Sequence, residues 1–364
     1  MAQIEIDRVS KGFKTSKILD DVSLSAETGQ IVVIFGPSGA GKTVLLRLVA
    51  GVEDLDAGTI RLQGRDVTWA PPEARGIGMA FQNFALFPHM SAYDNIASAL
   101  TAGVSSKAQI DAKVKSVAKL LKIGHVLQHA PRELSNGQKQ RAALARALVS
   151  DPRILLLDDP LRNVDAKLRY EMRMELPSLL RASCSTVLYV TQDYREAMAL
   201  GDKIAVLLDG GFVQVATPTE VYREPASLGV ARLFGDPTVN LIPATPTLSD
   251  GRPVFAVGNA LIAIPTAHAH AVGRDCVIGV RPEAIVVADQ AKPGSFPVEV
   301  VAVTPLNEKS VLLLRATDGR ELLAAESGEG CQPRRRGPAF ASFDRDAMLL
   351  FDAGTGLRLA PRTH

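Results

Sequence analysis

Residues 36–43, Gly36-Pro37-Ser38-Gly39-Ala40-Gly41-Lys42-Thr43, decide the fold of this chain. They fit the pattern G-x-x-x-x-G-K-[ST], in which the glycines let the backbone curl until successive N–H groups point inward at a polyphosphate. The run GQIVVIFG before the loop is typical of a strand buried in a parallel sheet, and VLLRLVAGV after it indicates a helix, whose N-terminus favours anions. The stretch therefore predicts a phosphate-binding loop. In such a loop Lys42 reaches the β- and γ-phosphates, and the Thr43 hydroxyl is a ligand for Mg²⁺.

A second candidate for the same site is Asp158, which ends the apolar run Ile154–Leu157. A carboxylate at the carboxyl edge of a buried parallel strand can hold Mg²⁺ through water. An aspartate after hydrophobic residues is by itself common and usually structural. Together with the glycine loop, it predicts the Mg²⁺ site of a nucleoside triphosphatase.

The chain up to residue 235 alternates between strand patterns and helix patterns. Residues 107–122 place Ile110, Val114, Val117, Ala118 and Leu121 on one face of an amphipathic helix. GQKQRAALARALVSDP indicates another helix, STVLYVT another strand, and DKIAVLLDGGFVQVA a hairpin that turns at Gly210-Gly211. This alternation predicts an α/β domain with a mostly parallel sheet covered by helices.

The pattern changes near Asp236-Pro237. Beyond this point short apolar runs recur at intervals of about ten residues, separated by Gly, Pro and Asp, which is typical of a small β-barrel or sandwich. We therefore predict two domains, residues 1–235 and residues 236–364.

Composition excludes several classes of protein. The net charge of +2 gives no reason to expect nucleic-acid binding, and no run of about 18 apolar residues could span a membrane. The N-terminus is unlike a signal peptide. The widely spaced Cys184, Cys276 and Cys331 fit a reducing compartment and no metal-binding spacing. His268 and His270 have no carboxylate or cysteine beside them, which favours a loop over a metal site.

The segment Leu134-Ser135-Asn136-Gly137-Gln138 opens the helix of GQKQRAALARAL. It presents a hydroxyl and bare backbone donors at a helix start, where a γ-phosphate could bind. A second phosphate-binding helix end in one domain suggests a site shared between two molecules. The alternative is an ordinary helix N-cap turn.

With these motifs in place, the chain resembles the nucleotide-binding subunits of ABC transporters over nearly its whole length. It most resembles the carbohydrate and polyol importer ATPases that carry a C-terminal regulatory domain of TOBE type, built from oligonucleotide-binding-like (OB-like) β-structure. The resemblance implies a P-loop ATPase domain with a helical subdomain at approximately residues 88–152, followed by an all-β C-terminal domain. It also implies that Ser135, Gly137 and Gln138 of one subunit close on the ATP that the glycine loop of another subunit holds.

Four further assignments rest on this resemblance. Phe13 matches the aromatic residue that stacks on adenine, with a place in the core of the first strands as the alternative. Gln82 matches the glutamine that contacts Mg²⁺ and the attacking water. Residues 83–95 match the surface that meets the membrane subunits. Asp165 matches the acidic end of the loop that communicates across the dimer.

The chain departs from the family's pattern at four positions. Asp159 stands where a glutamate usually follows the Mg²⁺ aspartate, and Gln192 stands where a histidine is usual. Asn136 replaces the first glycine of the signature, and Arg162 replaces a small serine. We predict that the catalytic group Asp159, Gln192 and Gln82 hydrolyses ATP slowly on this chain's own loop. An asymmetric pair with an unlike, competent ATPase subunit and a homodimer of reduced turnover are the two hypotheses that follow.

The resemblance further implies ATP and Mg²⁺ as cofactors. The implied partners are a second ATPase subunit in a head-to-tail dimer, two membrane-spanning permease subunits and, indirectly, a periplasmic solute-binding protein. The expected location is the cytoplasmic face of a bacterial inner membrane. The alternatives are a fully active homodimeric importer ATPase for a polyamine, sulfate or a metal ion, a soluble ABC ATPase without a transport role, and a regulatory module with a vestigial ATPase. Only about ninety residues separate Lys42 from Leu134, too few for the coiled-coil arm of DNA-repair relatives.

Overall fold

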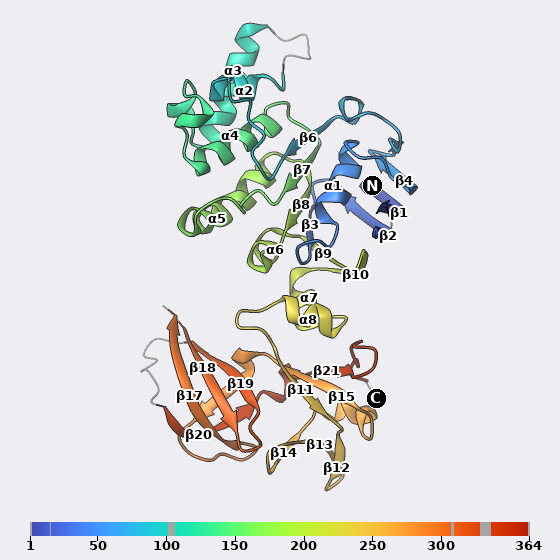
Figure 1. Ribbon diagram of the computed structural model, residues 1–364, viewed down its shortest axis with the longest axis vertical. Coiled ribbons are helices and arrows are strands. Elements are labelled where there is room, and N and C mark those ends of the chain that lie inside the picture. Colours follow the sequence, from blue (N-terminus) through green and yellow to red (C-terminus); the bar gives the residue numbers. More distant parts are fainter. Residues whose placement is uncertain (1, 15, 101–105, 307–308, 328–335, 363–364) are drawn as a thin grey trace. The chain divides into compact units, whose positions relative to one another are not determined.

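The computed structural model describes residues 2–14, 16–100, 106–306, 309–327 and 336–362 (Figure 1). The chain forms two compact units, residues 1–218 and residues 219–364. The division falls earlier in the chain than the boundary expected at residue 235. The short helix α7 (Pro218–Arg223) begins at the last residue of the first unit, and α8 (Leu228–Leu233) lies in the second. The assignment of functional domains to residues 1–235 and 236–364 stays a prediction, and Cys331 lies outside the described residues.

The central sheet of the first unit has the strand order β10-β9-β3-β8-β7-β6. Neighbouring strands from β9 to β6 are parallel, and β10 is antiparallel to β9. All residues of β3, β7 and β8 are buried, as their continuous apolar runs predict. The strand bounds are β3 Ile31–Phe35, β6 Ile77–Ala80, β7 Ile154–Asp158, β8 Thr186–Thr191, β9 Lys203–Leu208 and β10 Gly211–Ala216.

A second, antiparallel sheet in the first unit has the order β2-β1-β4-β5. Its apolar face shares one hydrophobic cluster with β3, β7, β8 and helix α1, so the two sheets enclose a common core. The bounds are β1 Ala2–Phe13, β2 Ser16–Glu27, β4 Ala57–Leu62 and β5 Arg65–Asp66.

Three helices of the first unit, α1, α3 and α4, lie where the sequence pattern predicts them. In Figure 1 α2, α3 and α4 gather in one lobe, away from β1, β2 and β4. Helix α3 buries Val114 and Ala118 of its predicted apolar face, and the side chain of Ser106 caps its first turn. The bounds are α1 Lys42–Ala50, α2 Ala92–Ala97, α3 Lys107–Leu120, α4 Asn136–Leu148, α5 Ala166–Ala182 and α6 Tyr194–Leu200.

The turn of the hairpin formed by β9 and β10 lies one residue earlier than predicted. Its turn lies at Asp209-Gly210, with φ of 48° and 81°, and Gly211 already pairs with Leu208. The predicted turn at Gly210-Gly211 was one residue late. A two-residue turn of type I′ needs positive φ at both central residues, and Asp-Gly meets this need with little strain.

The second unit is built from antiparallel strand pairs, in the orders β11-β15-β21, β12-β13-β14 and β16-β20-β17-β18-β19. These sheets surround a core of their own, as the regular spacing of apolar runs predicts. The bounds are β11 Asn240–Ala244, β12 Thr247–Ser249, β13 Arg252–Val257, β14 Ala260–Ala263, β15 Cys276–Val280, β16 Ile285–Ala288, β17 Phe296–Leu306, β18 Lys309–Ala316, β19 Glu321–Ser327, β20 Gly337–Phe343 and β21 Leu349–Asp352.

Arg281 anchors the short helices of this unit. Its buried guanidinium donates hydrogen bonds to the carbonyls of Phe234 and Tyr222 and stacks 3.6 Å from the centroid of the Tyr222 ring. Across the described part of the chain, none of the helices combines the length and the apolar character needed to cross a membrane.

Candidate functional site

The glycine loop connects β3 to α1, and two of its glycines hold backbone conformations that other residues avoid. Gly39 and Gly41 have φ of 84° and 99°. At Gly36 the constraint is space, because a Cβ there would lie 2.3 Å from the carbonyl oxygen of Leu207 on β9. The loop therefore packs directly against the sheet and feeds into α1, which begins at Lys42.

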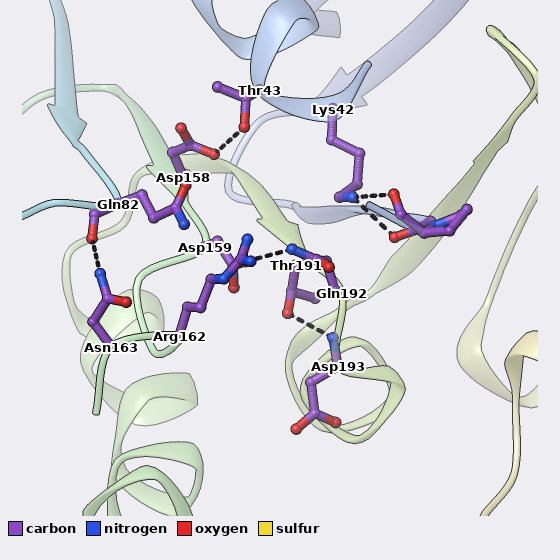
Figure 2. Close-up of polar contacts among 12 residues, drawn as sticks. Lys42, Thr43, Gln82, Asp158, Asp159, Arg162, Asn163, Thr191, Gln192 and Asp193 are labelled. Carbon is purple, nitrogen blue, oxygen red and sulfur yellow. Dashed lines mark hydrogen bonds and ion pairs between the residues drawn. The ribbon is translucent and has the colours of Figure 1, made fainter. Parts of the chain in front are cut away.

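Lys42 is buried and folds back over the loop (Figure 2). Its Nζ donates hydrogen bonds to the carbonyl oxygens of Gly36 and Pro37, at 2.9 and 2.7 Å. Burial lowers the pKa of this amine, and the nearby carboxylates of Asp159 and Asp158 oppose the shift. An ammonium held by neutral carbonyls is available to a polyphosphate without first breaking an ion pair.

Thr43 and Asp158 meet at the carboxyl end of β7. The Thr43 hydroxyl donates to Oδ1 of Asp158 at 2.9 Å. Burial raises the pKa of the Asp158 carboxyl, and the hydrogen bond from Thr43 opposes that shift. A hydroxyl and a partly desolvated carboxylate are hard oxygen ligands of the kind that Mg²⁺ prefers.

Three of the residues that depart from the family pattern meet at one carboxylate oxygen. Oδ2 of Asp159 accepts a hydrogen bond from Nε2 of Gln192 at 3.2 Å and lies 3.7 Å from Nη1 of Arg162 (Figure 2). The backbone of Asp159 has φ of 45°, and its N–H donates to the carbonyl of Val190 on the neighbouring strand. Burial raises the pKa of Asp159, whereas Gln192 and Arg162 act to lower it.

Most of these groups line one cleft of about 250 Å³, whereas Gly36, Pro37, Ala40 and Asp158 are not among its lining residues. Of the residues singled out in the sequence, the cleft brings together Phe13, Ser38, Gly39, Gly41, Lys42, Thr43, Gln82, Asp159, Arg162 and Gln192. Phe13 is 42% exposed, so the alternative that places it in the core is wrong. Sequence reasoning missed Ile18, Val44 and Val190, whose apolar side chains give no signal that separates a cleft wall from a core.

Ser135, Gly137, Gln138 and Asp165 do not line this cleft. Ser135 is the N-cap of α4, where its hydroxyl accepts from the Gln138 N–H and the Gln138 side chain accepts from the Ser135 N–H. The alternative N-cap role is thus present, yet Ser135 and Asn136 remain exposed at the helix tip. Asp165 similarly caps α5.

The segment after Gln82 leaves the cleft in a strained conformation. Phe84 and Ala85 have φ of 63° and 48°, a region that costs non-glycine residues of order 1 kcal/mol each. Arg146 of α4 donates to both of their carbonyls, at 3.2 and 2.7 Å. A second cavity of about 500 Å³ lies here, lined among others by Met79, Ala85, Phe87, Ser98 and Arg146.

Glu196 does not line the cleft, but it contacts residues next to Gln192, and sequence reasoning missed it. Its carboxylate is buried on α6 and accepts hydrogen bonds from the Tyr189 hydroxyl at 2.8 Å and from the Thr191 hydroxyl at 2.9 Å. The Thr191 hydroxyl in turn accepts from the Asp193 N–H (Figure 2). Glu196 therefore fixes the backbone on both sides of Gln192. A glutamate in the first turn of an amphipathic helix would ordinarily be expected to face solvent.

Burial raises the pKa of Glu196 to about 7, from a usual value of 4.5. The folded chain favours the protonated carboxyl of Glu196. The contribution of Glu196 to the stability of the folded state is therefore complete below pH 4.5 and is lost as the pH rises through 7. Glu196→Gln cannot ionise and avoids this loss. Its advantage over the unmodified chain in free energy of unfolding is therefore expected to increase by up to about 3 kcal/mol from pH 5 to pH 8. Urea unfolding followed by circular dichroism at both pH values measures this, and Glu171→Gln, at an exposed position of α5, is the control. Equal effects at pH 5 and pH 8 would contradict the prediction.

The fold and the cleft together define a P-loop nucleotide-binding protein. Residues 19–162 match the model of the ABC transporter family, and residues 278–351 match that of the TOBE domain. A relative from Cereibacter sphaeroides, "sn-glycerol-3-phosphate import ATP-binding protein UgpC", is 41% identical over 359 residues, which cover 99% of this chain and 100% of the relative. A protein of the same name from Salmonella typhimurium is 38% identical over 99% of this chain and 100% of its own length.

Solved structures agree with this result. The dimeric structure of MJ0796, a bacterial ABC transporter cassette, is 28% identical, has a TM-score of 0.55 and covers 59% of this chain and 98% of its own. A dimeric post-hydrolysis state of the same cassette, bound to ADP and Pi, has a TM-score of 0.54 with the same identity and coverage. This chain belongs to the ABC transporter family, and it is an ATPase subunit of that family with a C-terminal TOBE domain.

Proposed function

We propose that this chain is the ATP-hydrolysing subunit of an importer for a carbohydrate or polyol, with a phosphorylated polyol such as sn-glycerol 3-phosphate as the first solute to test. The observation that carries the proposal is full-length similarity, at 41% and 38% identity, to proteins named for the import of that compound. That the relatives are import proteins argues against a soluble ATPase without a transport role.

The cleft supports an arrangement for nucleotide. Phe13, exposed at the end of β1, would stack on adenine, and the N–H groups of residues 36–43 would surround the phosphates, with Lys42 on the β- and γ-groups. Thr43 and Asp158 would hold Mg²⁺, with Gln82 from the same cleft completing the set of oxygen donors. When bound, Mg²⁺ supplies positive charge that offsets the charge of the β- and γ-phosphates.

Ser135, Gly137 and Gln138 would act on a different molecule. The exposed tip of α4 lies outside the lining of this chain's own cleft, and the related cassettes are dimeric. We therefore place this tip against the nucleotide of a second ATPase subunit, arranged head to tail, with Asp165 at the end of the loop that faces that subunit.

Residues 83–95 would form the contact with membrane-spanning permease subunits. Phe87 of this segment is 43% exposed and lines the second cavity, together with Ala85 and Arg146. A concave, partly apolar surface of this kind suits a short helical segment of a permease. This contact would hold the chain on the cytoplasmic face of a bacterial inner membrane, where a periplasmic solute-binding protein would be an indirect partner.

The catalytic part of the site would work slowly. The Asp159 side chain is one methylene shorter than that of a glutamate, so its carboxylate ends about 1.5 Å closer to the backbone. Misplacement of a catalytic group by about 1 Å can cost about 100-fold in rate. Gln192 donates one of its two amide N–H groups to that same carboxylate and cannot become cationic. Slow turnover at this site fits either an asymmetric pair with an unlike ATPase subunit or a homodimer of reduced activity.

Uptake by cells tests the solute. Deleting the gene in its native host is expected to abolish uptake of labelled sn-glycerol 3-phosphate, and the unmodified gene, but not its Lys42→Ala variant, is expected to restore it. If the deletion instead abolishes uptake of a polyamine, sulfate or a metal ion, the proposed solute is wrong and the assignment to the ABC transporter family stands.

A tagged chain purified from membranes is expected to bring two permease subunits with it. An unlike second ATPase subunit in the same preparation would decide for the asymmetric pair.

A further inference from the structure

Arg162 has no role in the proposed arrangement, although it lies in the middle of the site. It belongs to the loop between β7 and α5, and its backbone N–H donates to the carbonyl of Asp159 at 3.2 Å. Its side chain turns back into the cleft beside Gln192, as Figure 2 shows, and remains 48% exposed. The guanidinium therefore reaches both solvent and the buried carboxylate of Asp159.

Arg162 changes the charge of the cleft. Of the residues that line the cleft, Lys42 and Arg162 are cationic and Asp159 is anionic. Arg162 lies beside the Asp159 carboxylate and is close enough to Lys42 to lower the pKa of its amine. Without Arg162 the Asp159 carboxylate would lose its guanidinium neighbour, which would weaken binding of a phosphoryl group placed at this end of the cleft.

The position of Arg162 along the cleft decides which phosphate group it could reach. Phe13 marks the end that would hold the base, and Lys42 marks the β- and γ-phosphates. Arg162 lies with Asp159 and Gln192, the pair expected around the terminal phosphate and its attacking water. A cation at this end would contact the terminal phosphoryl group, which ATP has and ADP lacks.

We propose that Arg162 is a specificity-determining residue that makes this cleft prefer nucleoside triphosphates over diphosphates. Without a triphosphate, its guanidinium pairs with Oδ2 of Asp159. A terminal phosphoryl group carries more negative charge and more acceptor oxygens than this carboxylate, so it draws the guanidinium away. ADP offers no such group and leaves the ion pair in place. This inference rests on the proposed function, because it requires the cleft to bind nucleotide.

Equilibrium binding tests it in the full-length chain. The ligands are Mg²⁺ with ADP and Mg²⁺ with the non-hydrolysable imido analogue of ATP, measured by calorimetry. Arg162→Ser is expected to weaken binding of the analogue by about tenfold, the effect of one charge-assisted contact worth about 1.4 kcal/mol, and to change binding of ADP by less than about twofold. Arg162→Lys keeps the charge, and its affinity for the analogue is expected to lie between those of the unmodified chain and of Arg162→Ser. Arg181→Ser, which removes an exposed ion-paired arginine outside the cleft, is the matched control.

A double-mutant cycle provides a second test, in which binding of the analogue is expected to become tighter rather than weaker. Asp159→Asn removes the competing carboxylate, so it is expected to tighten binding of the analogue. The gain is expected to be larger when Arg162 is present than in combination with Arg162→Ser, because only Arg162 is released by the change. Equal gains in the two backgrounds would contradict the exchange.

The outcomes separate the two levels of the proposal. If the unmodified chain binds neither ligand, the proposed function fails. If it binds both, but Arg162→Ser leaves the ratio of their affinities unchanged, only the role of Arg162 is wrong. Unchanged melting temperatures for the variants show that a loss of binding does not come from unfolding.

Discussion

A chain that carries Asp159→Glu together with Gln192→His is expected to hydrolyse ATP about 100-fold faster than the unmodified chain. The glutamate would bring its carboxylate about 1.5 Å further toward the terminal phosphate. The histidine would restore a side chain that can carry positive charge and exchange protons. The two positions are in direct contact, so neither replacement alone is expected to give the full gain. Steady-state release of phosphate by the purified chain at saturating Mg²⁺-ATP measures the effect.

The control for this gain is the same pair of changes combined with Lys42→Ala, which should remove the activity and show that it belongs to this cleft. Turnover by the unmodified chain that already reaches about 10 s⁻¹, the median for enzymes, would show that these residues do not weaken the site. In that case a homodimer of this chain would be active by itself, and no unlike ATPase subunit would be needed.

Gly36→Ala is expected to reduce affinity for ATP by at least about 100-fold and to lower the free energy of unfolding by about 1–3 kcal/mol. The added Cβ would lie 2.3 Å from the Leu207 carbonyl oxygen, a backbone atom of β9 that cannot turn aside. The loop must move instead, and its N–H groups then lose their common direction. Nucleotide titration and urea unfolding measure the two effects.

Gly29→Ala is the matched control for the effect on stability. Gly29 has positive φ, at 75°, which Gly36 does not, but a Cβ at Gly29 would meet nothing within 4 Å, so only the conformational cost of about 1 kcal/mol applies. ATP affinity should be unchanged in that variant. Binding by Gly36→Ala that equals binding by the unmodified chain would mean that the loop tolerates displacement from the sheet.

The first unit could be predicted from the sequence because its signals are local. Continuous apolar runs identify buried parallel strands, and the glycine loop identifies the edge at which they end. Asp159 and Gln192 are distant in sequence, but each follows the carboxyl end of a strand, and the register that pairs Asp158 with Val190 brings them together. Parallel pairing alone therefore predicts that they are neighbours.

Arg162 and Glu196 show where sequence reasoning stops. A surface-type residue in a loop and a glutamate in the first turn of a helix give no sign that one turns into the cleft and the other is buried. Those directions depend on the packing of α5 and α6, which no local pattern encodes. The hairpin turn was one residue off for a related reason, since Gly210 can occupy either position of the turn and only strand register decides.

The segment from Gln82 to Ala85, which contains two residues with positive φ, joins the nucleotide cleft to the second cavity described above. Gln82 lines the nucleotide cleft and Ala85 lines the second cavity, so no more than about 11 Å of backbone joins them. The peptides between them are held from outside, by Asn163 at the Gln82 carbonyl and by Arg146 at the next two residues with positive φ. Because these hydrogen bonds hold the segment in place, we expect a shift of its peptides at the cleft to be transmitted to the second cavity through this short stretch of backbone.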